Sequence, residues 1–211
     1  NAVPIQLPIG YGQEFRGLIE LVTMEAWVYS ALEEKEMIDI PAEMADEVAA
    51  ARTALIEAVA EREEALLEKY LAGEEIAVED IQRVLREGVI ANEIQPVLCG
   101  SALRDKGIQR VCDGVVDYLP SPLDLPPTRV EDEEGVESER PCEDDAKLTA
   151  LAFKTIHDRT GDLTFLRIYS GRIERGMQVY NTRKRKVERI GRLMVMKADQ
   201  KEPVEAAGAG Q

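Results

Sequence analysis

The order of hydrophobic and polar residues in one stretch of the chain predicts a strand, a tight loop and a helix. Residues 94–99 are mostly apolar, which favours a buried strand of a parallel sheet, and Gly100 breaks the run. Residues 108–119 follow with apolar side chains at helical spacing, and Asp105 is the expected cap and Pro120 the expected stop. The apolar stripe consists of Ile108, Val111, Cys112, Val115, Val116 and Leu119. Loops of this kind lie at the carboxyl end of a parallel strand, where open α/β sheets bind ligands.

The residues before this stretch predict short strands followed by two helices. Apolar side chains alternate with Pro and Gln over residues 3–9, as on an edge strand, and a hairpin is expected around residues 22–24. The longest helix is predicted over residues 41–71, with Gly73 as its stop, and a second helix over residues 78–90. The apolar stripe of the longest helix consists of Met44, Val48, Leu55, Val59, Leu66 and Tyr70.

After residue 120 the pattern becomes that of a β-rich domain. The proline-rich residues 120–127 predict a stiff exit from the α/β part, and residues 128–146 predict an acidic surface linker. Residues 147–211 contain several short apolar runs separated by turn residues, which indicates a small β-barrel. About 65 residues are few for a closed barrel, so we expect an incomplete one.

Charge is distributed unevenly along the chain. The 211 residues have a net charge of −15. Residues 131–145 carry nine acids and one base, whereas residues 146–211 carry fourteen bases and seven acids, so we expect different partners for the two halves. Three cysteines without a C-x-x-C spacing and a single histidine, His157, argue against a disulfide framework, a cysteine metal site and any two-histidine mechanism.

The same composition bounds where the protein works. The cysteine usage fits a reducing cytosol, and no run of about 18 apolar residues predicts a membrane span. Asn1 starts the sequence without an initiator methionine or a signal-peptide pattern, as expected for the middle of a longer chain.

Three groups of residues are candidates for binding chemistry. The loop after Cys99 offers the backbone N–H groups and hydroxyl of 101–103 to a ligand. Acidic residues on the two predicted helices favour a solvated helix face. Residues 183–186, Arg-Lys-Arg-Lys, are equally compatible with binding a phosphate backbone and with a solvated hairpin tip. Gly10 and Gly12 do not have the spacing of a G-x-x-x-x-G-K-[ST] phosphate loop, so we interpret them as a turn.

Four stretches, in family order, resemble elongation factor G, the bacterial translocation GTPase. Residues 1–10 resemble the segment after its guanine-recognising N-K-x-D motif. Residues 100–103, Gly-Ser-Ala-Leu, with residues 106–109 resemble its fifth guanine-nucleotide motif and the helix that follows. Residues 117–122 resemble the exit from its GTPase domain, and residues 163–171 resemble the opening hairpin of its second domain.

The resemblance implies an α+β multidomain fold with defined boundaries. Residues 1–127 would be the C-terminal part of a P-loop-type GTPase domain, with an insert subdomain over about 15–93 and the guanine-motif strand, loop and helix at 94–119. Residues 128–146 would be the acidic linker. Residues 147–211 would be an incomplete antiparallel Greek-key β-barrel.

The resemblance also implies roles for individual residues. The residues expected to contact the guanine base of GTP or GDP are Ser101, Ala102 and Leu103. The acids expected to contact the ribosomal stalk protein are Glu61, Glu64 and Glu68. The cations expected to contact ribosomal RNA of the small subunit are Arg183, Lys184, Arg185 and Lys186.

The sequence also lacks motifs that such GTPases need. It has no Walker A lysine with its magnesium-binding Ser or Thr and no N-K-x-D, which are among the groups that bind the nucleotide and Mg²⁺ in such GTPases. We therefore assign no catalytic residue and no metal ligand within this chain. GTP and Mg²⁺ are expected cofactors of a cytoplasmic parent protein, and the 211 residues alone are expected to be inactive and to bind no nucleotide.

Other interpretations remain open at this point. A ribosome-recycling paralogue of the same family would share all these stretches, and a stand-alone, non-enzymatic module could recruit a partner through its acidic helices. A tetracycline-resistance protection protein is disfavoured, because the long insert resembles the elongation factor's better. The strand near Ile94 lacks predicted sheet neighbours, so a non-native dimer through its apolar surface is also expected to be accessible.

Overall fold

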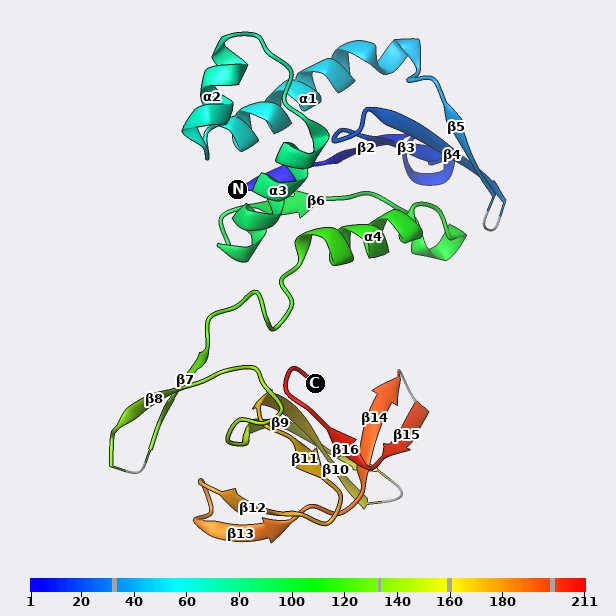
Figure 1. The fold of residues 1–211 in the computed structure, drawn as a ribbon. Coiled ribbons are helices and arrows are strands. Elements are labelled where there is room, and N and C mark those ends of the chain that lie inside the picture. Colours follow the sequence, from blue (N-terminus) through cyan, green and yellow to red (C-terminus); the bar gives the residue numbers. More distant parts are fainter. Residues whose placement is uncertain (32–33, 133, 159–160, 198–199) are drawn as a thin grey trace. The chain divides into compact units, whose positions relative to one another are not determined.

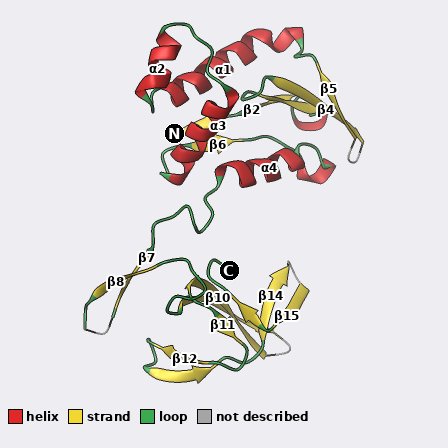
Figure 2. Ribbon diagram, in the orientation of Figure 1, coloured by secondary structure: helices red, strands yellow, loops and turns green. Residues whose placement is uncertain are grey.

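The protein consists of two compact units, Asn1–Pro120 and Ser121–Gln211. The structure is a computed structural model, and it describes residues 1–31, 34–132, 134–158, 161–197 and 200–211. Figures 1 and 2 show that the helices belong to the first unit and that the second unit is built from strands. The predicted mixed α+β character is confirmed.

The described residues of unit 1 form two sheets. Strands β2 (Gln6–Ile9), β3 (Gly17–Glu20), β4 (Glu25–Ala31) and β5 (Glu34–Ile38) form an antiparallel sheet in that order. Strands β1 (Ala2–Pro4) and β6 (Gln95–Val97) pair in parallel. The predicted hairpin around residues 22–24 is the β3–β4 hairpin, in which Leu18 lies opposite Trp27. Gly10 (φ 82°) and Gly12 (φ 57°) form the turn between β2 and β3, as predicted.

Four α-helices accompany these strands: α1 (Ala45–Ala60), α2 (Glu64–Leu71), α3 (Val78–Ile90) and α4 (Ile108–Tyr118). In Figure 1 the strands β2 and β6 lie between α1 and α4. Short 3₁₀ turns cover Gly12–Glu14, Ala42–Met44 and Ala102–Arg104.

The prediction of one helix over 41–71 is wrong, because the chain breaks between α1 and α2. Glu63 has an extended backbone (φ −140°, ψ 119°), which starts a new helix. A continuous helix of that length would extend about 45 Å and carry Leu66 away from Leu55. The break lets both side chains enter one core, where Leu66 is 2% and Leu55 1% exposed. The predicted stop is confirmed, since Gly73 (φ 72°) and Glu74 donate backbone hydrogen bonds to the last turn of α2.

The core of unit 1 joins α1, α2 and α3 to the strands. Its most buried side chains are Ile5, Ile9, Ile19, Leu21, Leu55, Leu66, Ile81, Leu85, Val48 and Val59. Helix α3, present as predicted over 78–90, supplies Ile81, Val84 and Leu85 to this core at helical spacing. Helical periodicity therefore identified the inward faces of α1 to α3 correctly.

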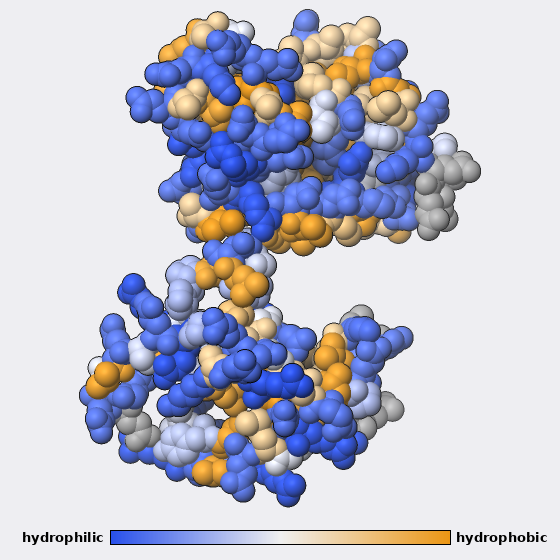
Figure 3. Space-filling model, viewed as in Figure 1, coloured by the Kyte–Doolittle hydropathy of each residue, from blue (hydrophilic) through white to orange (hydrophobic). Residues whose placement is uncertain are grey.

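Helix α4 is present as predicted, but its apolar stripe does not face the core. Tyr118 is 5% exposed, and Gly114 lies so close to Leu98 that an added Cβ would approach its Cδ2 to 2.9 Å. The opposite face carries exposed Cys112, Val115, Val116 and Leu119. Figure 3 shows hydrophobic side chains gathered along the α4 edge of unit 1. The small residue at position 114, rather than the apolar stripe, determines which face of α4 approaches the strands.

Two further expectations for this region are wrong. Strand β6 is parallel, but Val97 is 43% exposed, because β1 is its only partner strand among the described residues. Asp105 does not cap α4: it has a left-handed backbone (φ 51°), and Gly107 (φ 77°) occupies the cap position. Gly107 is required there, since its φ is positive and its buried Cα lies against Leu18.

Unit 2 consists of paired strands: β7 (Thr128–Glu131), β8 (Glu137–Arg140), β9 (Thr149–Asp158), β10 (Gly161–Ser170), β11 (Ile173–Glu174), β12 (Gln178–Asn181), β13 (Lys186–Arg189), β14 (Leu193–Lys197), β15 (Gln200–Val204) and β16 (Ala206–Ala207). All pairs are antiparallel, and the described strands form no closed barrel. The acidic segment predicted as a linker forms the exposed β7–β8 hairpin, whose register places Thr128 opposite Arg140.

The C-terminal residues are held against β10. The backbone of Ile168 donates to Gln211 and accepts from Gly210, each at 2.8 Å. The N–H of Ala209 donates to Asp144 Oδ1 at 2.8 Å. Ile168 is 3% exposed as a result, so the C-terminal residues help to cover the small buried region of unit 2. Across the described ranges, the structure has no helix long and apolar enough to cross a bilayer.

Candidate functional site

The loop after Cys99 is held in a fixed turn by its own backbone. The Ser101 N–H donates to the Lys106 carbonyl at 2.8 Å, and the Lys106 N–H donates back to Ser101 at 3.1 Å. Ala102–Arg104 form a 3₁₀ turn inside this bridge. The expectation that all three predicted N–H groups are available is therefore wrong for Ser101, whose N–H is already bonded. The backbone N–H groups of Ala102 and Leu103 have no acceptor among the described residues.

Side chains attach this turn to the loop between β2 and β3. Arg104 Nη1 donates to the Gln13 carbonyl at 2.6 Å, and Lys106 Nζ donates to the Phe15 carbonyl at 3.5 Å. An open hollow of about 250 Å³ lies between the two loops. Its lining residues are Pro8, Gly10, Tyr11, Gly12, Phe15, Cys99, Gly100 and Ser101. Ser101 thus lines the hollow, whereas Ala102 and Leu103 follow it on an exposed turn, with Leu103 96% exposed.

Below the loop, a chain of polar contacts leads into unit 1. Gln6 Oε1 accepts the Cys99 N–H at 3.0 Å, and Gln6 Nε2 donates to Glu20 Oε1 at 2.7 Å. Glu20 lies 3.7 Å from Arg110 Nε of α4. Burial raises the pKa of Glu20, and the Gln6 hydrogen bond and Arg110 oppose that shift. Burial, with a smaller contribution from Glu20, raises the pKa of the Cys99 thiol to about 11, so Cys99 is a neutral structural thiol rather than a nucleophile.

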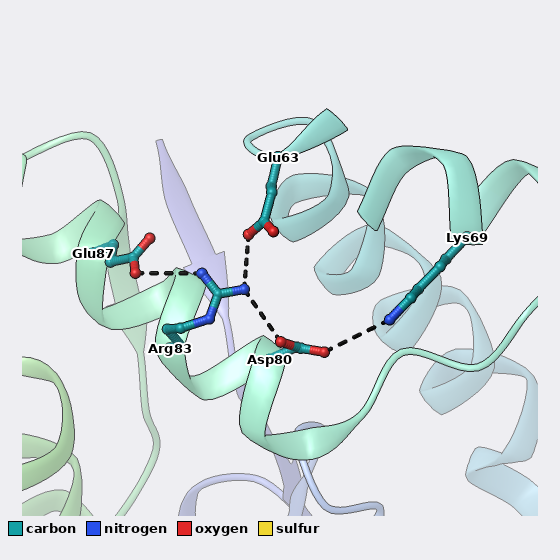
Figure 4. Close-up of polar contacts among 5 residues, drawn as sticks. All are labelled: Glu63, Lys69, Asp80, Arg83 and Glu87. Carbon is teal, nitrogen blue, oxygen red and sulfur yellow. Dashed lines mark hydrogen bonds and ion pairs between the residues drawn. The ribbon is translucent and has the colours of Figure 1, made fainter. Parts of the chain in front are cut away.

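Arg83 of α3 binds several of the acidic side chains on the helices. As Figure 4 shows, its guanidinium contacts Glu63 at 2.7 Å, Asp80 at 3.2 Å and Glu87 at 3.3 Å. Lys69 of α2 lies 4.0 Å from Asp80. These contacts connect α3 to the break between α1 and α2, which gives the bonded acids a structural role.

The three acids predicted to meet a partner are not part of this network. Glu61 ends α1, and Glu64 and Glu68 lie on α2; all three are exposed. Within the described chain no cation pairs with them. Leu67 and Leu71 are 37% and 76% exposed on the same short helix. The outer side of α2 is therefore both acidic and partly apolar.

The four predicted cations lie in and beside the turn between β12 and β13. All four are exposed, and Arg185 has a left-handed backbone (φ 51°). Lys184 and Lys186 each reach Glu188 Oε1 at 3.2 Å. No ion pair to Arg183 or Arg185 is formed by the described residues. The structure thus separates two bonded cations from two unbonded ones, a difference that the sequence pattern did not reveal.

Comparison with known proteins identifies the second unit. Residues 147–211 match the family model of elongation factor G domain 2. These residues are similar to domain 2 of elongation factor G. A crystal structure of a protein from Thermus thermophilus matches 99% of the chain with a TM-score of 0.74 and 29% sequence identity. The chain spans 29% of the length of that protein.

The candidate residues lie on three surfaces: the loop at 101–106 and the outer side of α2 belong to unit 1, and the turn between β12 and β13 belongs to unit 2. Sequence reasoning missed Gln6, which is 4% exposed and connects the loop to Glu20. Gln6 is a polar member of the alternation over residues 3–9, which predicted an exposed edge strand, so the pattern gave no signal for its burial.

Proposed function

We propose that this chain works within a cytoplasmic translational GTPase that binds and hydrolyses GTP and drives translocation on the ribosome. The observation that carries the proposal is the match of residues 147–211 to elongation factor G domain 2. The complete gene product should hydrolyse GTP faster with ribosomes than without them, and it should advance messenger and transfer RNA by one codon. Subunit dissociation without codon movement would instead support a recycling factor, and absence of ribosome-stimulated hydrolysis would overturn both.

Within this assembly the turn at 101–103 would contact the guanine base through Ala102 and Leu103. Its support is the pair of N–H groups without an acceptor among the described residues, held in place by the bridge between Ser101 and Lys106. A fixed N–H donates to the guanine carbonyl and meets only a donor in adenine, so the turn would favour guanine. Ser101 would contribute its hydroxyl rather than its N–H.

The phosphates and Mg²⁺ would be held by groups outside these 211 residues. The described residues contain no group of three His, Cys, Asp or Glu side chains placed to hold a metal ion. GTP with Mg²⁺ supplies the transferable phosphoryl group and the charge that stabilises its transfer. The isolated chain should therefore show no GTP hydrolysis and no saturable GTP binding at micromolar concentration, as measured by calorimetry.

The outer side of α2 would contact the ribosomal stalk protein. Glu61, Glu64 and Glu68, which pair with no cation of the described chain, lie beside exposed Leu71 and suit a partner with basic and apolar side chains. Replacing the three acids by Gln should weaken stalk binding in a pull-down, whereas replacing two acids of the exposed β8 strand should not. Equal binding by both variants would remove this role. Self-association through the apolar surface of the strand near Ile94 also stays a prediction, which light scattering tests.

A further inference from the structure

The turn between β12 and β13 carries four cations at residues 183–186, and a nearby acid, Glu188, pairs with some of them. Glu188 of β13 accepts from Lys184 Nζ and Lys186 Nζ at 3.2 Å each, and its other oxygen accepts from Asn181 Nδ2 at 3.1 Å. These three contacts, with Asn181 the largest cause, lower the pKa of Glu188 to about 2. The acid is therefore charged throughout the physiological range and offsets lysine charge at the turn.

The turn itself keeps the two arginines outside this cluster. Asn181 Oδ1 accepts the Lys184 N–H at 3.0 Å, which fixes the start of the loop. Asn181 pairs with Lys186 across the hairpin, so residues 182–185 project beyond the last strand pair. Arg183 and Arg185 lie in that projecting part, and neither takes part in the Glu188 cluster.

The neighbouring surface favours a nucleic acid over other anionic partners. Tyr180 is 53% exposed and lies opposite Val187, one residue from the turn. An exposed aromatic ring on the hairpin that also carries arginines outside the Glu188 cluster suits a single-stranded RNA, because bases stack on aromatic rings and guanidinium groups bind phosphates bidentately. An anionic membrane surface is the alternative partner that the test below includes.

We propose that Glu188 divides the four cations of this turn, so that Arg183 and Arg185 contact RNA phosphates while Lys184 and Lys186 are withheld by the carboxylate. The inference rests on the proposed RNA contact of this turn and goes beyond it by making the four cations unequal. Each phosphate contact to single-stranded nucleic acid contributes about 0.7 to the slope of log affinity against log salt concentration. Two contacts give a slope of about 1.4, or about a sevenfold change in affinity between about 50 and 200 mM salt.

The test measures binding of a fluorescently labelled poly-U RNA of about 20 nucleotides to the full 211-residue chain by anisotropy, from about 50 to 200 mM KCl. Arg183→Gln with Arg185→Gln should lower the slope by about 1.4, and Lys184→Gln with Lys186→Gln should lower it by less than half as much. Glu188→Gln should steepen the slope and make the lysine pair matter as much as the arginine pair. Circular dichroism melts of each variant check that the turn still folds. Glu188→Gln should keep the hydrogen bond from Asn181, because the Gln carbonyl still accepts it.

The outcomes separate this inference from the proposed function. If the wild-type chain binds the RNA but both double variants lose the same slope, or Glu188→Gln changes nothing, the division by Glu188 is wrong and the RNA contact stands. If the wild-type chain fails to bind the RNA, or binds phosphatidylserine vesicles in its place, the RNA contact itself fails and the inference with it.

Discussion

Replacing Ala102 by proline should weaken binding of guanine nucleotides to the complete gene product without disturbing the fold. Proline removes one group only, the backbone N–H, which has no acceptor among the described residues. Ala102 is the first residue of its 3₁₀ turn, a position that proline tolerates. Ser101 before it is extended (φ −131°, ψ 100°), the conformation that a following proline requires. The substitution is therefore expected to leave the melting temperature unchanged.

The size of the effect follows from the hydrogen bond that is lost. Leaving the guanine carbonyl without its donor costs about 1–3 kcal/mol. That cost corresponds to about 5- to 150-fold weaker binding. Fluorescence titration with a labelled GDP measures it, and Leu103→Ala is the matched control, because it keeps the N–H and removes a side chain that is 96% exposed. Wild-type affinity in Ala102→Pro would refute a role for this turn in base recognition.

Three further predictions concern stability. Leu85→Ala, at a site 0% exposed, should lower the unfolding free energy of unit 1 by about 2–5 kcal/mol, as followed by the single tryptophan, and should leave unit 2 unchanged. Gly171→Ala should lower the melting temperature of unit 2, because φ is +75° and the new Cβ would lie 2.6 Å from Leu148 Cα, whereas Gly191→Ala meets no atom within 4 Å and should be silent. Burial raises the pKa of Glu20 above 4.5 in the folded state. Ionised Glu20 therefore lowers the unfolding free energy above the folded-state pKa, whereas below pH 4.5 the carboxyl is protonated and has no such effect. The unfolding free energy of Glu20→Gln, measured by urea melts, should therefore rise relative to that of the wild type as pH rises from below 4.5 to neutral. A difference between the two proteins that stays constant with pH would contradict this sign.

The sequence predicted the elements of unit 1 well, because most of them bury one face. Helix α3 was placed at its observed bounds, and the hairpin of β3 and β4 was correct, since both depend on local periodicity and turn residues. The break at Glu63 was missed because its cause is tertiary: α2 must return to bring Leu66 into the core. Periodicity alone does not reveal where a helix has to turn back.

The sequence identified the residues of the candidate sites but not how the structure arranges them. The apolar spacing of α4 predicted the helix correctly but indicated the wrong buried face. The small Gly114 allows the other face of the helix to approach Leu98. The loop at 101–106 was placed correctly, yet its internal bridge could not be read from residue types, since backbone groups leave no signature in a sequence. The role of Glu188 was likewise invisible until the hairpin register brought it beside the lysines.

The turn after Cys99 is proposed to contact a guanine base in the complete protein. Amide hydrogen exchange of the complete gene product, measured with and without GDP, tests this contact. We expect slower exchange at Ala102 and Leu103 with GDP and no change with ADP. Unchanged exchange across residues 100–106 in saturating GDP would contradict it.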